Sequence, residues 1–525
     1  MKKLHPVLLS CLSGLLLFAA WPASPLTLLI FIAFVPLLWL EHQGIRRRRF
    51  FGWVYLTMFI WNTAATWWIW NASEPGAAGA ILANSLIMCL PWLGFHFIKA
   101  KLGPKLGYPA LVALWLTFEY FHLQNWGLSW PWLTLGNVFA GQPAWVQWYS
   151  ITGTSGGGLW ILSVNVLIFL CLSQLPVRPT KKRIAITLVV LFLPFLLSLL
   201  TLPSANTAQL NSKTNIVIVQ PNIDPYEKLT TGSFDAMMHK LIRLSDSAID
   251  DSTALVVWPE TALYMEQAIN EVDMKGNYFL NPLWDFLRRH PQINLLTGVE
   301  SYRTFKEPHD DARLIPNTST YFESYNAAVM LDSTGPLQFY HKSRLVPGVE
   351  TLPAFLHFLD AWFEKFGGTT AGYTGQADRT PMATSNHSYI VAPAVCYESI
   401  YGEFMSNYIR NGANIIAVIT NDGWWGNTPG YRQHRDYARL RAIETRHWVV
   451  RSANTGVSCI IDPSGHIMEA RPWLESAVIK AHVPATEERT FYVKHGDVLS
   501  RLAILAAFLV TLWAIIQVIK RRRRG

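Results

Sequence analysis

Charged residues are scarce in this sequence: they make up 15% of its 525 residues, while 51% are hydrophobic and 23 are tryptophan. So few charges exclude a chain that is water-soluble along its whole length. Cysteine is scarce as well, with five residues, which excludes a disulfide-rich secreted scaffold. Part of the chain is therefore expected to lie in lipid.

Eight apolar runs are long enough to cross the roughly 30 Å hydrocarbon core of a membrane. We expect a bundle of eight transmembrane helices, built from a first domain of residues 1–203 and a C-terminal segment of residues 498–525. A soluble domain of residues 204–497 separates the two in sequence. The predicted spans are Pro6–Trp21, Leu26–Leu40, Phe51–Trp70, Ala78–Ile98, Tyr108–Leu123, Gly158–Leu175, Ile184–Leu202 and Leu502–Ile519.

Lysine and arginine are missing from alternate short loops, and this pattern orients the predicted bundle. The loops 71–76 and 124–157 contain neither residue. Because basic residues accumulate on the cytoplasmic side, both termini are predicted to be cytoplasmic and the soluble domain to face the other side. The formal net charge of +9 follows from this topology, so no nucleic-acid partner is expected. The basic residues on which this orientation rests are Lys2, Lys3, Arg46–Arg49, Lys99, Lys101, Lys105, Arg178, Lys181, Lys182, Arg183 and Lys520–Arg524.

Two processing signals compete with this topology. The first apolar run resembles a signal peptide, and the sequence around Cys11 loosely resembles a lipid-attachment box. Too little apolar sequence precedes Cys11 for such a box, and removal of the run would spoil the charge alternation. We therefore predict an uncleaved first helix.

The loop 124–157 is rich in tryptophan, and two interpretations of it remain open. It forms either a vestibule for lipid or an aromatic belt that anchors the bundle. Just before it, Glu119 and His122 are expected to form structural hydrogen bonds rather than to catalyse a reaction. Gly153–Gly157 fits the spacing of a hydrolase nucleophile elbow without a preceding strand, so we interpret it as a flexible connection to the next helix.

From residue 204 the composition becomes that of a soluble globular domain in which strands and helices alternate. Runs rich in Val, Ile and Ala predict strands that are buried on both faces, which indicates an α/β domain. His309, Asp310 and Asp311 offer metal-ligand types without the spacing of a metal site, so we interpret them as a solvated loop and expect no metal or cofactor. Strands are predicted at Asn215–Gln220, Ala254–Trp258, Ile293–Gly298, Asn326–Leu331, Tyr389–Val395 and Ile415–Ile419, and helices at Phe234–Ile249 and Tyr431–Thr445.

Three local sequences place reactive side chains where predicted strands end, which is where α/β folds gather such groups. Glu260 lies in the sequence WPET, Lys342 in YHKSRLVP and Cys396 in VCYES. Taken singly, each has an ordinary interpretation: a surface carboxylate, a surface lysine and an inert core thiol. A helix predicted to start near Ile400, together with a nearby lysine, would instead favour the Cys396 thiolate. One disulfide, between Cys396 and Cys459, is formally open, but the context of Cys396 favours a free thiol.

The order and spacing of these three sequences resemble the nitrilase superfamily of Glu-Lys-Cys enzymes. Four later stretches resemble one membrane branch of that superfamily, the apolipoprotein N-acyltransferases. The resemblance covers nearly the whole chain and implies an αββα sandwich for the soluble domain, with seven spans before it and one after it. The later stretches are TNDGWWG at 420–426, Gln433-His434, ARLRA at 438–442 and RSANTG at 451–456.

Two sites in the sequence depart from the usual pattern of that family. Gly348 and Val349 stand where the family commonly has Phe and Gly, without a change in the spacing between Lys342 and Glu350. Leu229 stands where relatives often carry Trp. These departures put contacts with the substrates in question more than the catalytic residues.

The resemblance implies a role for each residue of the predicted site. Glu260 is the general base, and Cys396 is the nucleophile that carries the acyl group as a thioester. Lys342 stabilises the oxyanion together with the backbone N–H of Tyr397. Two supporting carboxylates, Glu350 and Glu398, would orient Lys342 and the incoming amine, although either could equally be a structural ion-pair partner.

The implied function is a ping-pong acyl transfer at the periplasmic face of a bacterial inner membrane, performed by a monomer. A phospholipid is the acyl donor, and the acceptor is the α-amino group of the diacylglyceryl-modified N-terminal cysteine of an apolipoprotein. Two alternatives remain: a membrane-anchored amidase or nitrilase, and a lipid-binding or transport module with an inactive nitrilase-like domain. Eight spans would bring nothing to an enzyme for small soluble amides, which favours the acyltransferase.

Overall fold

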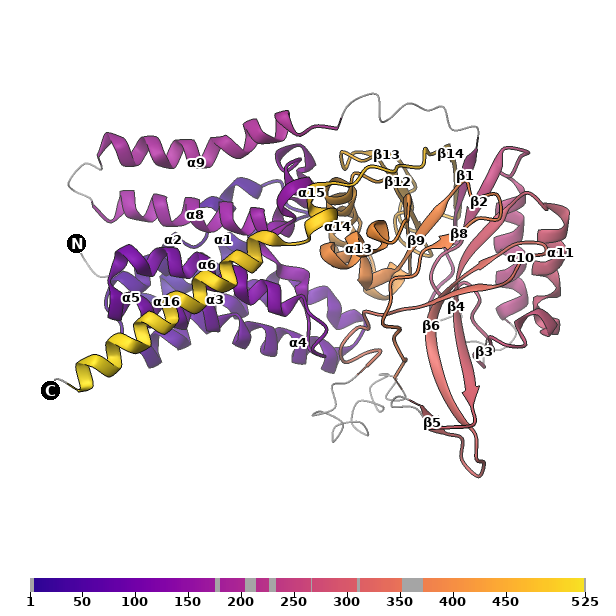
Figure 1. The fold of residues 1–525 in the computed structure, drawn as a ribbon, viewed down its shortest axis with the longest axis horizontal. Helices are drawn as coiled ribbons and strands as arrows, with labels where there is room; N and C mark the ends of the chain where they lie inside the picture. Colours follow the sequence, from indigo (N-terminus) through magenta and orange to yellow (C-terminus); the bar gives the residue numbers. More distant parts are fainter. Residues whose placement is uncertain are drawn as a thin grey trace. The chain divides into compact units, whose positions relative to one another are not determined.

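The chain forms two compact units in its computed structural model (Figure 1). The helical unit comprises residues 1–70, 74–202 and 495–525, and the sheet unit comprises residues 71–73 and 203–494. The structure describes residues 4–174, 180–203, 214–225, 233–265, 267–308, 312–351 and 372–523. Positions of the sequence interpretation that lie outside the described residues are Lys2, Lys3, Arg178, Leu229, His309–Asp311 and Arg524.

Each of the eight predicted apolar runs contains helix in the structure. By length and apolarity, four helical stretches within the described residues can cross a membrane, namely Glu74–Leu102, Ser155–Leu172, Lys181–Leu200 and Val498–Arg522. Four of the eight predicted spans therefore have the length and apolarity that a membrane span requires. The helices of this unit are α1 (Pro6–Ala20), α2 (Val35–His42), α3 (Arg47–Thr66), α4 (Glu74–Ile87), α5 (Cys89–Leu102), α6 (Pro104–His122), α7 (Tyr149–Thr152), α8 (Ser155–Leu172), α9 (Lys181–Leu200) and α16 (Val498–Arg522).

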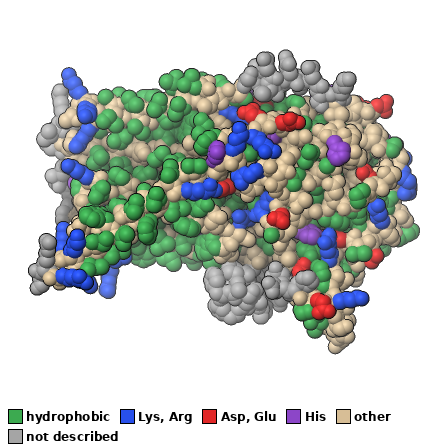
Figure 2. Space-filling view, in the orientation of Figure 1, with side chains coloured by type: hydrophobic (Ala, Val, Ile, Leu, Met, Phe, Trp, Pro, Cys, Tyr) green, Lys and Arg blue, Asp and Glu red, His purple; other side chains and the backbone are tan. Residues whose placement is uncertain are grey.

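The other four runs do not reach the length and apolarity of a membrane span, and the sequence shows why. Pro6–Ala20 and Thr27–His42 are shorter than the roughly 20 residues that a perpendicular span requires. Helix α3 begins with three arginines, and α6 carries Lys105 near its start and Glu119 near its end. Figure 2 nevertheless shows hydrophobic side chains over the visible face of the helical unit, with Lys and Arg gathered at the end where both termini lie.

A buried asparagine on α8 holds the break between Thr27–Phe31 and α2. The side chain of Asn165 accepts a hydrogen bond from Phe34 N at 2.8 Å and donates one to Ile30 O at 2.8 Å. Pro36 lies in the first turn of α2, so the chain cannot continue one regular helix through this point. Asn165 therefore satisfies backbone groups that lipid could not.

The tryptophan-rich loop 124–157 packs largely inside the helical unit. Trp132 is 1% exposed and Trp148 is 6% exposed, so an anchoring belt could use the 41% exposed Trp126 but not these two rings. Glu119 accepts hydrogen bonds from Leu135 N at 2.7 Å and from the Trp115 indole at 2.9 Å, which is the structural role predicted for it.

The glycine run at the end of this loop is packed rather than flexible, so that part of the prediction is wrong. Helix α8 begins at Ser155, inside the run. A Cβ atom on Gly157 would lie 1.9 Å from Tyr149 Oη and 2.9 Å from Gly136 Cα. Only glycine allows this close approach of the first turn of α8, and the element that precedes it is helix α7.

The sheet unit has four layers, with two sheets between two pairs of helices (Figure 1). The first sheet has the order β14-β1-β2-β4-β6-β5, with β3 paired to β4 and β7 to β6; the second has the order β13-β12-β11-β10-β9-β8. Helices α10 (Ser233–Asp246) and α11 (Asn281–Arg289) cover the first sheet, and α13 (Gly402–Arg410) and α14 (Pro429–Thr445) cover the second. This α/β architecture confirms the predicted fold class of the domain.

The central strands of both sheets are parallel and buried, which explains why runs of Val, Ile and Ala in the sequence predicted them. The prediction missed strands β11 to β14 and the full length of the antiparallel pair of β4 with β6, which runs from Leu295↔Leu331 to Phe305↔Tyr321. The strands are β1 (Asn215–Gln220), β2 (Thr253–Val257), β3 (Ile269–Asn270), β4 (Asn294–Phe305), β5 (Arg313–Leu314), β6 (Tyr321–Leu331), β7 (Gln338–His341), β8 (Met382–Ala383), β9 (Ile390–Val395), β10 (Ile415–Thr420), β11 (Val449–Ala453), β12 (Cys459–Ile461), β13 (Ile467–Ala470) and β14 (Ala477–His482).

Candidate active site

Cys396 lies directly after strand β9, in a turn that strains its backbone. Its φ angle is 52°, in the left-handed region that a residue with a Cβ atom rarely adopts. Strain of this kind costs on the order of 1–3 kcal/mol and persists where the surrounding structure fixes it, as in the turns that present nucleophiles. The thiol is free, as is that of Cys459, so the disulfide between them is not formed.

The α-helix predicted to start near Ile400 is present, but Cys396 does not lie at its N-terminus. Residues Cys396–Ile400 form a single 3₁₀ turn, and the α-helix α13 starts only at Gly402. A five-residue 3₁₀ turn has a weak dipole, because the dipole of a helix is a sum over its aligned peptide groups. The positive charge beside the thiol therefore comes from a side chain.

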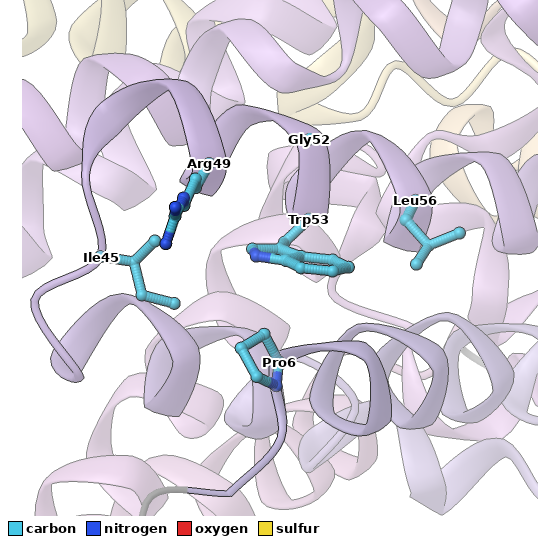
Figure 3. A pocket seen from close by; sticks show the side chains of 6 residues that line it. All are labelled: Pro6, Ile45, Arg49, Gly52, Trp53 and Leu56. Atoms are coloured by element: carbon cyan, nitrogen blue, oxygen red, sulfur yellow. The ribbon is translucent and has the colours of Figure 1, made fainter.

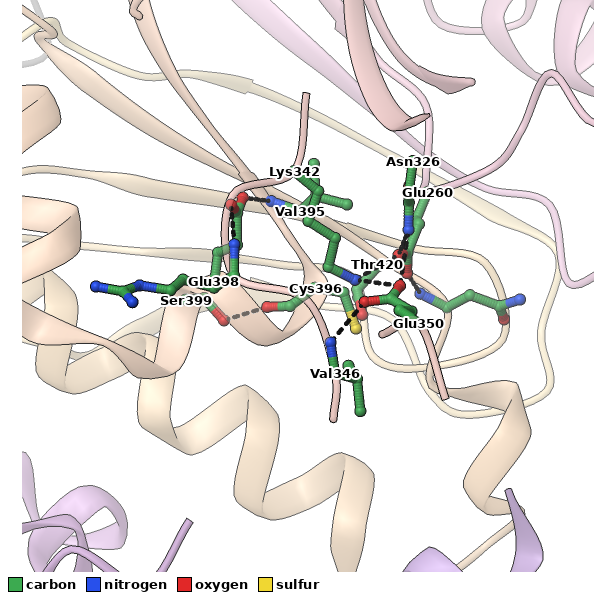
Figure 4. A network of polar contacts seen from close by, with 12 residues as sticks. Glu260, Asn326, Lys342, Val346, Glu350, Val395, Cys396, Glu398, Ser399 and Thr420 are labelled. Atoms are coloured by element: carbon green, nitrogen blue, oxygen red, sulfur yellow. Dashed lines mark hydrogen bonds and ion pairs between the residues drawn. The ribbon is translucent and has the colours of Figure 1, made fainter. Parts of the chain in front are cut away.

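That side chain is Lys342, which follows strand β7 and is 1% exposed. Its Nζ atom lies 2.7 Å from Glu350 Oε1 and 3.3 Å from Glu260 Oε1 (Figure 4). Burial alone would lower the pKa of Lys342, but the charges of Glu350 and Glu260 raise it well above its ordinary value. Lys342 therefore carries its charge at neutral pH and acts as a fixed positive group rather than as a base.

Asn326 is a second donor to the same two carboxylates, and the sequence interpretation missed it. Its side-chain amide donates to Glu260 Oε1 at 2.9 Å and to Glu350 Oε1 at 3.0 Å. Asn326 lies on β6, and its carbonyl oxygen also accepts a hydrogen bond from Lys342 N at 2.9 Å. A buried asparagine at the start of the apolar run 326–331 is the signal that could have revealed it.

Glu260 is held from both of its carboxylate oxygens. Besides the donors to Oε1, the backbone N–H of Asn421, at the end of β10, donates to Oε2 at 3.1 Å. Pro259 precedes Glu260 in the turn that follows β2, and its carbonyl oxygen accepts a hydrogen bond from Gly298 N at 3.1 Å. Strands from both sheets thus fix the position of this carboxylate.

The environment of Cys396 keeps its thiol protonated at rest. Burial raises the pKa of the thiol, the charge of Glu260 raises it further, and the charge of Lys342 lowers it. The net direction is upward, above the ordinary value for cysteine. A nucleophilic role for this sulfur would require a base that removes its proton, and Glu260 lies close enough for its charge to act on the thiol.

The predicted supporting residues Glu350, Glu398 and Tyr397 lie in different parts of the site. Glu350 bonds to Lys342 directly and accepts a hydrogen bond from Val346 N at 2.8 Å. Glu398 is fully buried on the other side of Cys396 from Glu260 (Figure 4). Tyr397, whose backbone N–H is the predicted oxyanion donor, has a buried ring packed 5.4 Å from that of Tyr401.

Glu398 joins the turn of Cys396 to the segment that carries Lys342. Its Oε2 accepts a hydrogen bond from Val395 N at 2.9 Å, and its Oε1 accepts hydrogen bonds from Ser343 N and the Tyr340 hydroxyl, both at 2.6 Å. Burial raises the pKa of Glu398, although these hydrogen bonds oppose that shift. Glu398 thus supports Lys342 through the backbone of Ser343, and its hydrogen bonds serve the architecture of the site.

A second buried network lies against the backbone of Cys396. His434 Nε2 lies 3.1 Å from the carbonyl oxygen of Cys396, and His434 Nδ1 lies 3.0 Å from Asp422 Oδ1. Arg451 donates to Asp422 Oδ2 at 2.7 Å. Burial would raise the pKa of Asp422, but Arg451 and His434 lower it to about 2. These residues lie in the stretches that resemble the membrane branch of the nitrilase superfamily. The sequence analysis assigned them no role, because their contacts join distant parts of the chain.

The sheet unit, with a thiol, an ammonium group and two carboxylates at its strand ends, is a carbon–nitrogen hydrolase domain. Residues 215–491 match the family described as Carbon-nitrogen hydrolase. Residues 13–167 match a second family, described as the Apolipoprotein N-acyltransferase N-terminal domain.

Two relatives that match this chain over nearly its whole length are named apolipoprotein N-acyltransferase. A Chlorobaculum tepidum protein named apolipoprotein N-acyltransferase is 31% identical to this chain, over 98% of this chain and 97% of the relative. One from Pseudomonas putida is 27% identical, over 97% of this chain and 94% of the relative. The chain therefore belongs to the apolipoprotein N-acyltransferase family.

Proposed function

We propose that this protein transfers an acyl chain from a phospholipid, through a thioester on Cys396, to the N-terminal amine of an apolipoprotein. The observation that carries the proposal is the Lys342 ammonium group, held between Glu260 and Glu350 beside a nucleophile with a φ angle of 52°. Family membership supports the choice of acyl transfer among the reactions open to such a site.

The first half-reaction forms the thioester. Glu260 takes the proton of the Cys396 thiol, and the sulfur attacks the ester carbonyl of the phospholipid. Lys342 and the backbone N–H of Tyr397 stabilise the oxyanion that develops, and removal of one such donor typically costs about 100-fold or more in rate. When the intermediate collapses, the bond to the glycerol oxygen breaks and Glu260 returns the proton to the departing lysophospholipid.

The second half-reaction moves the acyl group to nitrogen. The acceptor is the α-amino group of an S-diacylglyceryl cysteine at the N-terminus of the apolipoprotein. It attacks the thioester carbonyl, Glu260 takes a proton from the amine nitrogen, and as the carbon–sulfur bond breaks Glu260 passes that proton to the departing sulfur of Cys396. Because Lys342 stays charged, Glu260 is the group that suits the base role in both halves of this ping-pong reaction.

We further propose a multi-pass topology of eight spans in a bacterial inner membrane, in which the domain 204–497 faces the periplasm and both termini face the cytoplasm. The alternation of basic and non-basic loops supports it. The gathering of Lys and Arg at the end of the helical unit that holds both termini also supports it. Both lipid substrates would then reach the enzyme, acting as a monomer, without leaving the bilayer.

The test is to incubate the purified full-length protein with acyl-labelled phospholipid and to measure protein-bound label that neutral hydroxylamine releases. Cys396→Ser is compared with Cys459→Ser, which removes a buried thiol from β12 of the same unit. Wild type and Cys459→Ser are expected to acquire label and pass it to a diacylglyceryl-cysteine peptide, and Cys396→Ser is expected to remain unlabelled.

Two other outcomes would replace the proposal. Label that forms on Cys396 but passes only to water, with or without the peptide, would point to a membrane-anchored hydrolase. No label on any variant would point to an inactive module that binds or transports lipid.

A further inference from the structure

Two adjoining hollows lie where the start of α1 meets the start of α3 in the helical unit. Their volumes are about 510 and 640 Å³, and they share Pro6, Ile45 and Arg49. Together they form one continuous groove, which we call the N-terminal groove. None of the residues of the candidate active site belongs to the unit that forms it. The remaining lining residues are Leu4, His5, Gln43, Gly44, Arg46, Gly52, Trp53 and Leu56.

One end of the N-terminal groove carries positive charge without a counter-ion among the described residues. Arg46 is the N-cap of α3 and Arg49 lies in its first turn, and both line the same hollow. The ion pairs within the described part of the helical unit join Glu41 to His96 and Lys99, and they leave both arginines without an acidic partner. No described residue that lines the groove is acidic.

The other end of the groove is apolar. Trp53 and Leu56 continue the face of α3 that carries Arg49, because positions 49, 53 and 56 repeat at helical spacing. Figure 3 shows Arg49 and Ile45 beside one end of the Trp53 ring, Leu56 beyond its other end and Pro6 facing it. A ligand that fills the groove therefore meets two guanidinium groups first and an aromatic and aliphatic wall one turn further along the helix.

We propose that the N-terminal groove binds an anionic phospholipid, with the headgroup phosphate on Arg46 and Arg49 and the start of an acyl chain along Trp53 and Leu56. Guanidinium groups bind phosphate with charge-assisted hydrogen bonds, and basic pockets at helix ends on the cytoplasmic side suit anionic headgroups. A free phosphate ion would use the arginines alone and would leave the apolar wall unexplained. This lipid is a bound companion of the helical unit, separate from the acyl donor that the Cys396 site consumes.

Arg47 and Arg48 provide a matched control, since they lie between the two groove residues in sequence, are exposed and do not line the groove. Arg46→Gln/Arg49→Gln and Arg47→Gln/Arg48→Gln remove the same charge from the same four-residue segment at the start of α3. Any effect of overall charge on membrane binding would therefore be equal in the two double variants.

The experiment measures the thermal unfolding midpoint of the full-length protein in neutral detergent during titration with dioleoylphosphatidylglycerol. Parallel titrations use dioleoylphosphatidylcholine, inorganic phosphate and glycerophosphoglycerol, which has the headgroup without acyl chains. We expect saturable stabilisation by phosphatidylglycerol alone. The half-saturating concentration should rise roughly tenfold or more in Arg46→Gln/Arg49→Gln and remain unchanged in Arg47→Gln/Arg48→Gln.

Three results would each overturn the proposal. Equal weakening in the two double variants would mean diffuse attraction between the basic end of the unit and the lipid. Equal stabilisation by phosphatidylcholine would remove the role of charge. Equal stabilisation by inorganic phosphate or glycerophosphoglycerol would remove the role of the apolar wall. Midpoints measured without lipid show whether both double variants fold as well as the wild type does.

Discussion

Gly298 lies so close to the backbone of Glu260 that a Cβ atom in its place would be 2.6 Å from Glu260 Cα. The same atom would be 2.4 Å from the backbone nitrogen of Thr261, whose φ angle is 49°. Neither contact can be relieved by rotating a side chain, because both partners are backbone atoms. Because residue 298 has no side chain, strand β4 can pack directly against the turn that carries Glu260.

Replacement of this glycine should move the base away from the thiol. We expect Gly298→Ala to lower the rate of thioester formation by about 100-fold, since misplacement of a reacting group by about 1 Å has that effect. The measurement is the rate of label transfer to Cys396 in single-turnover experiments. Gly276→Ala is the control, because a Cβ atom there meets nothing within 4 Å. Similar rates in the two variants would show that Glu260 does not need its present position.

A second prediction separates the charge of Lys342 from its effect on stability. Lys342→Met leaves Glu260 and Glu350 buried without their shared cation, so we expect both a lower unfolding midpoint and loss of transfer. Adding Glu350→Gln removes one of the stranded charges and should restore much of the midpoint. Transfer in the double variant should stay at least about 100-fold below that of the wild type, because the oxyanion still lacks its cation. Recovery of transfer along with the midpoint would reduce Lys342 to a counter-ion for Glu350.

A third prediction concerns the pH dependence of the thiol. Burial raises the pKa of Cys396 and the charge of Glu260 raises it further, so Glu260→Gln should lower that pKa while it abolishes acyl transfer. Alkylation of Cys396 by iodoacetamide should begin at a lower pH in Glu260→Gln than in the wild type, because only the thiolate reacts.

Mass spectrometry of the Cys396 peptide across a pH series measures this alkylation. Cys459 serves as an internal reference, since burial raises its pKa to about 11. A shift of the alkylation profile toward higher pH in Glu260→Gln would mean that the carboxylate stabilises the thiolate, which contradicts the role of a base acting on a protonated thiol.

Local sequence was enough to predict the central strands, and it singled out Glu260, Lys342 and Cys396 without joining them into one site. Strand β1 was predicted with its observed bounds, because a strand buried on both faces needs an uninterrupted apolar run. Glu260 and Cys396 each follow such a run, whereas Lys342 follows the short strand β7, whose sequence QFYH gave no such signal. Their grouping came from the resemblance to a family, since no spacing along the chain encodes a distance across two sheets.

The missed features depend on contacts between distant residues. Asn326 looked like one more strand residue, and its two carboxylate partners lie 66 and 24 positions away. The glycine run before α8 was interpreted as flexible because its tight contact with Tyr149 has no local signature. The eight apolar runs were visible, yet within the described residues four helical stretches meet the length and apolarity of a span, because runs such as Pro6–Ala20 are too short.

The last prediction concerns the network against the backbone of Cys396. Asp422→Asn keeps the shape of the side chain but leaves the fully buried Arg451 without its counter-ion. Loss of one partner of a buried ion pair costs about 3–5 kcal/mol, so the unfolding midpoint at neutral pH should fall clearly. Asp285→Asn is the control, because the ion pair of Asp285 with Arg288 is exposed and worth little.

The effect of Asp422→Asn should also depend on pH with a defined sign. The pKa of Asp422 is lowered from an ordinary 3.8 to about 2, so its ionised form stabilises the fold above 3.8, and this contribution is lost as the pH falls through 2. The difference in midpoint between wild type and Asp422→Asn should therefore be constant from pH 7 to about 4 and should shrink below that. Midpoints measured for both proteins in the same buffers at each pH cancel the titration of other carboxylates. A difference that persisted undiminished toward pH 2 would mean that Asp422 stabilises the turn of Cys396 through hydrogen bonds that do not need its charge.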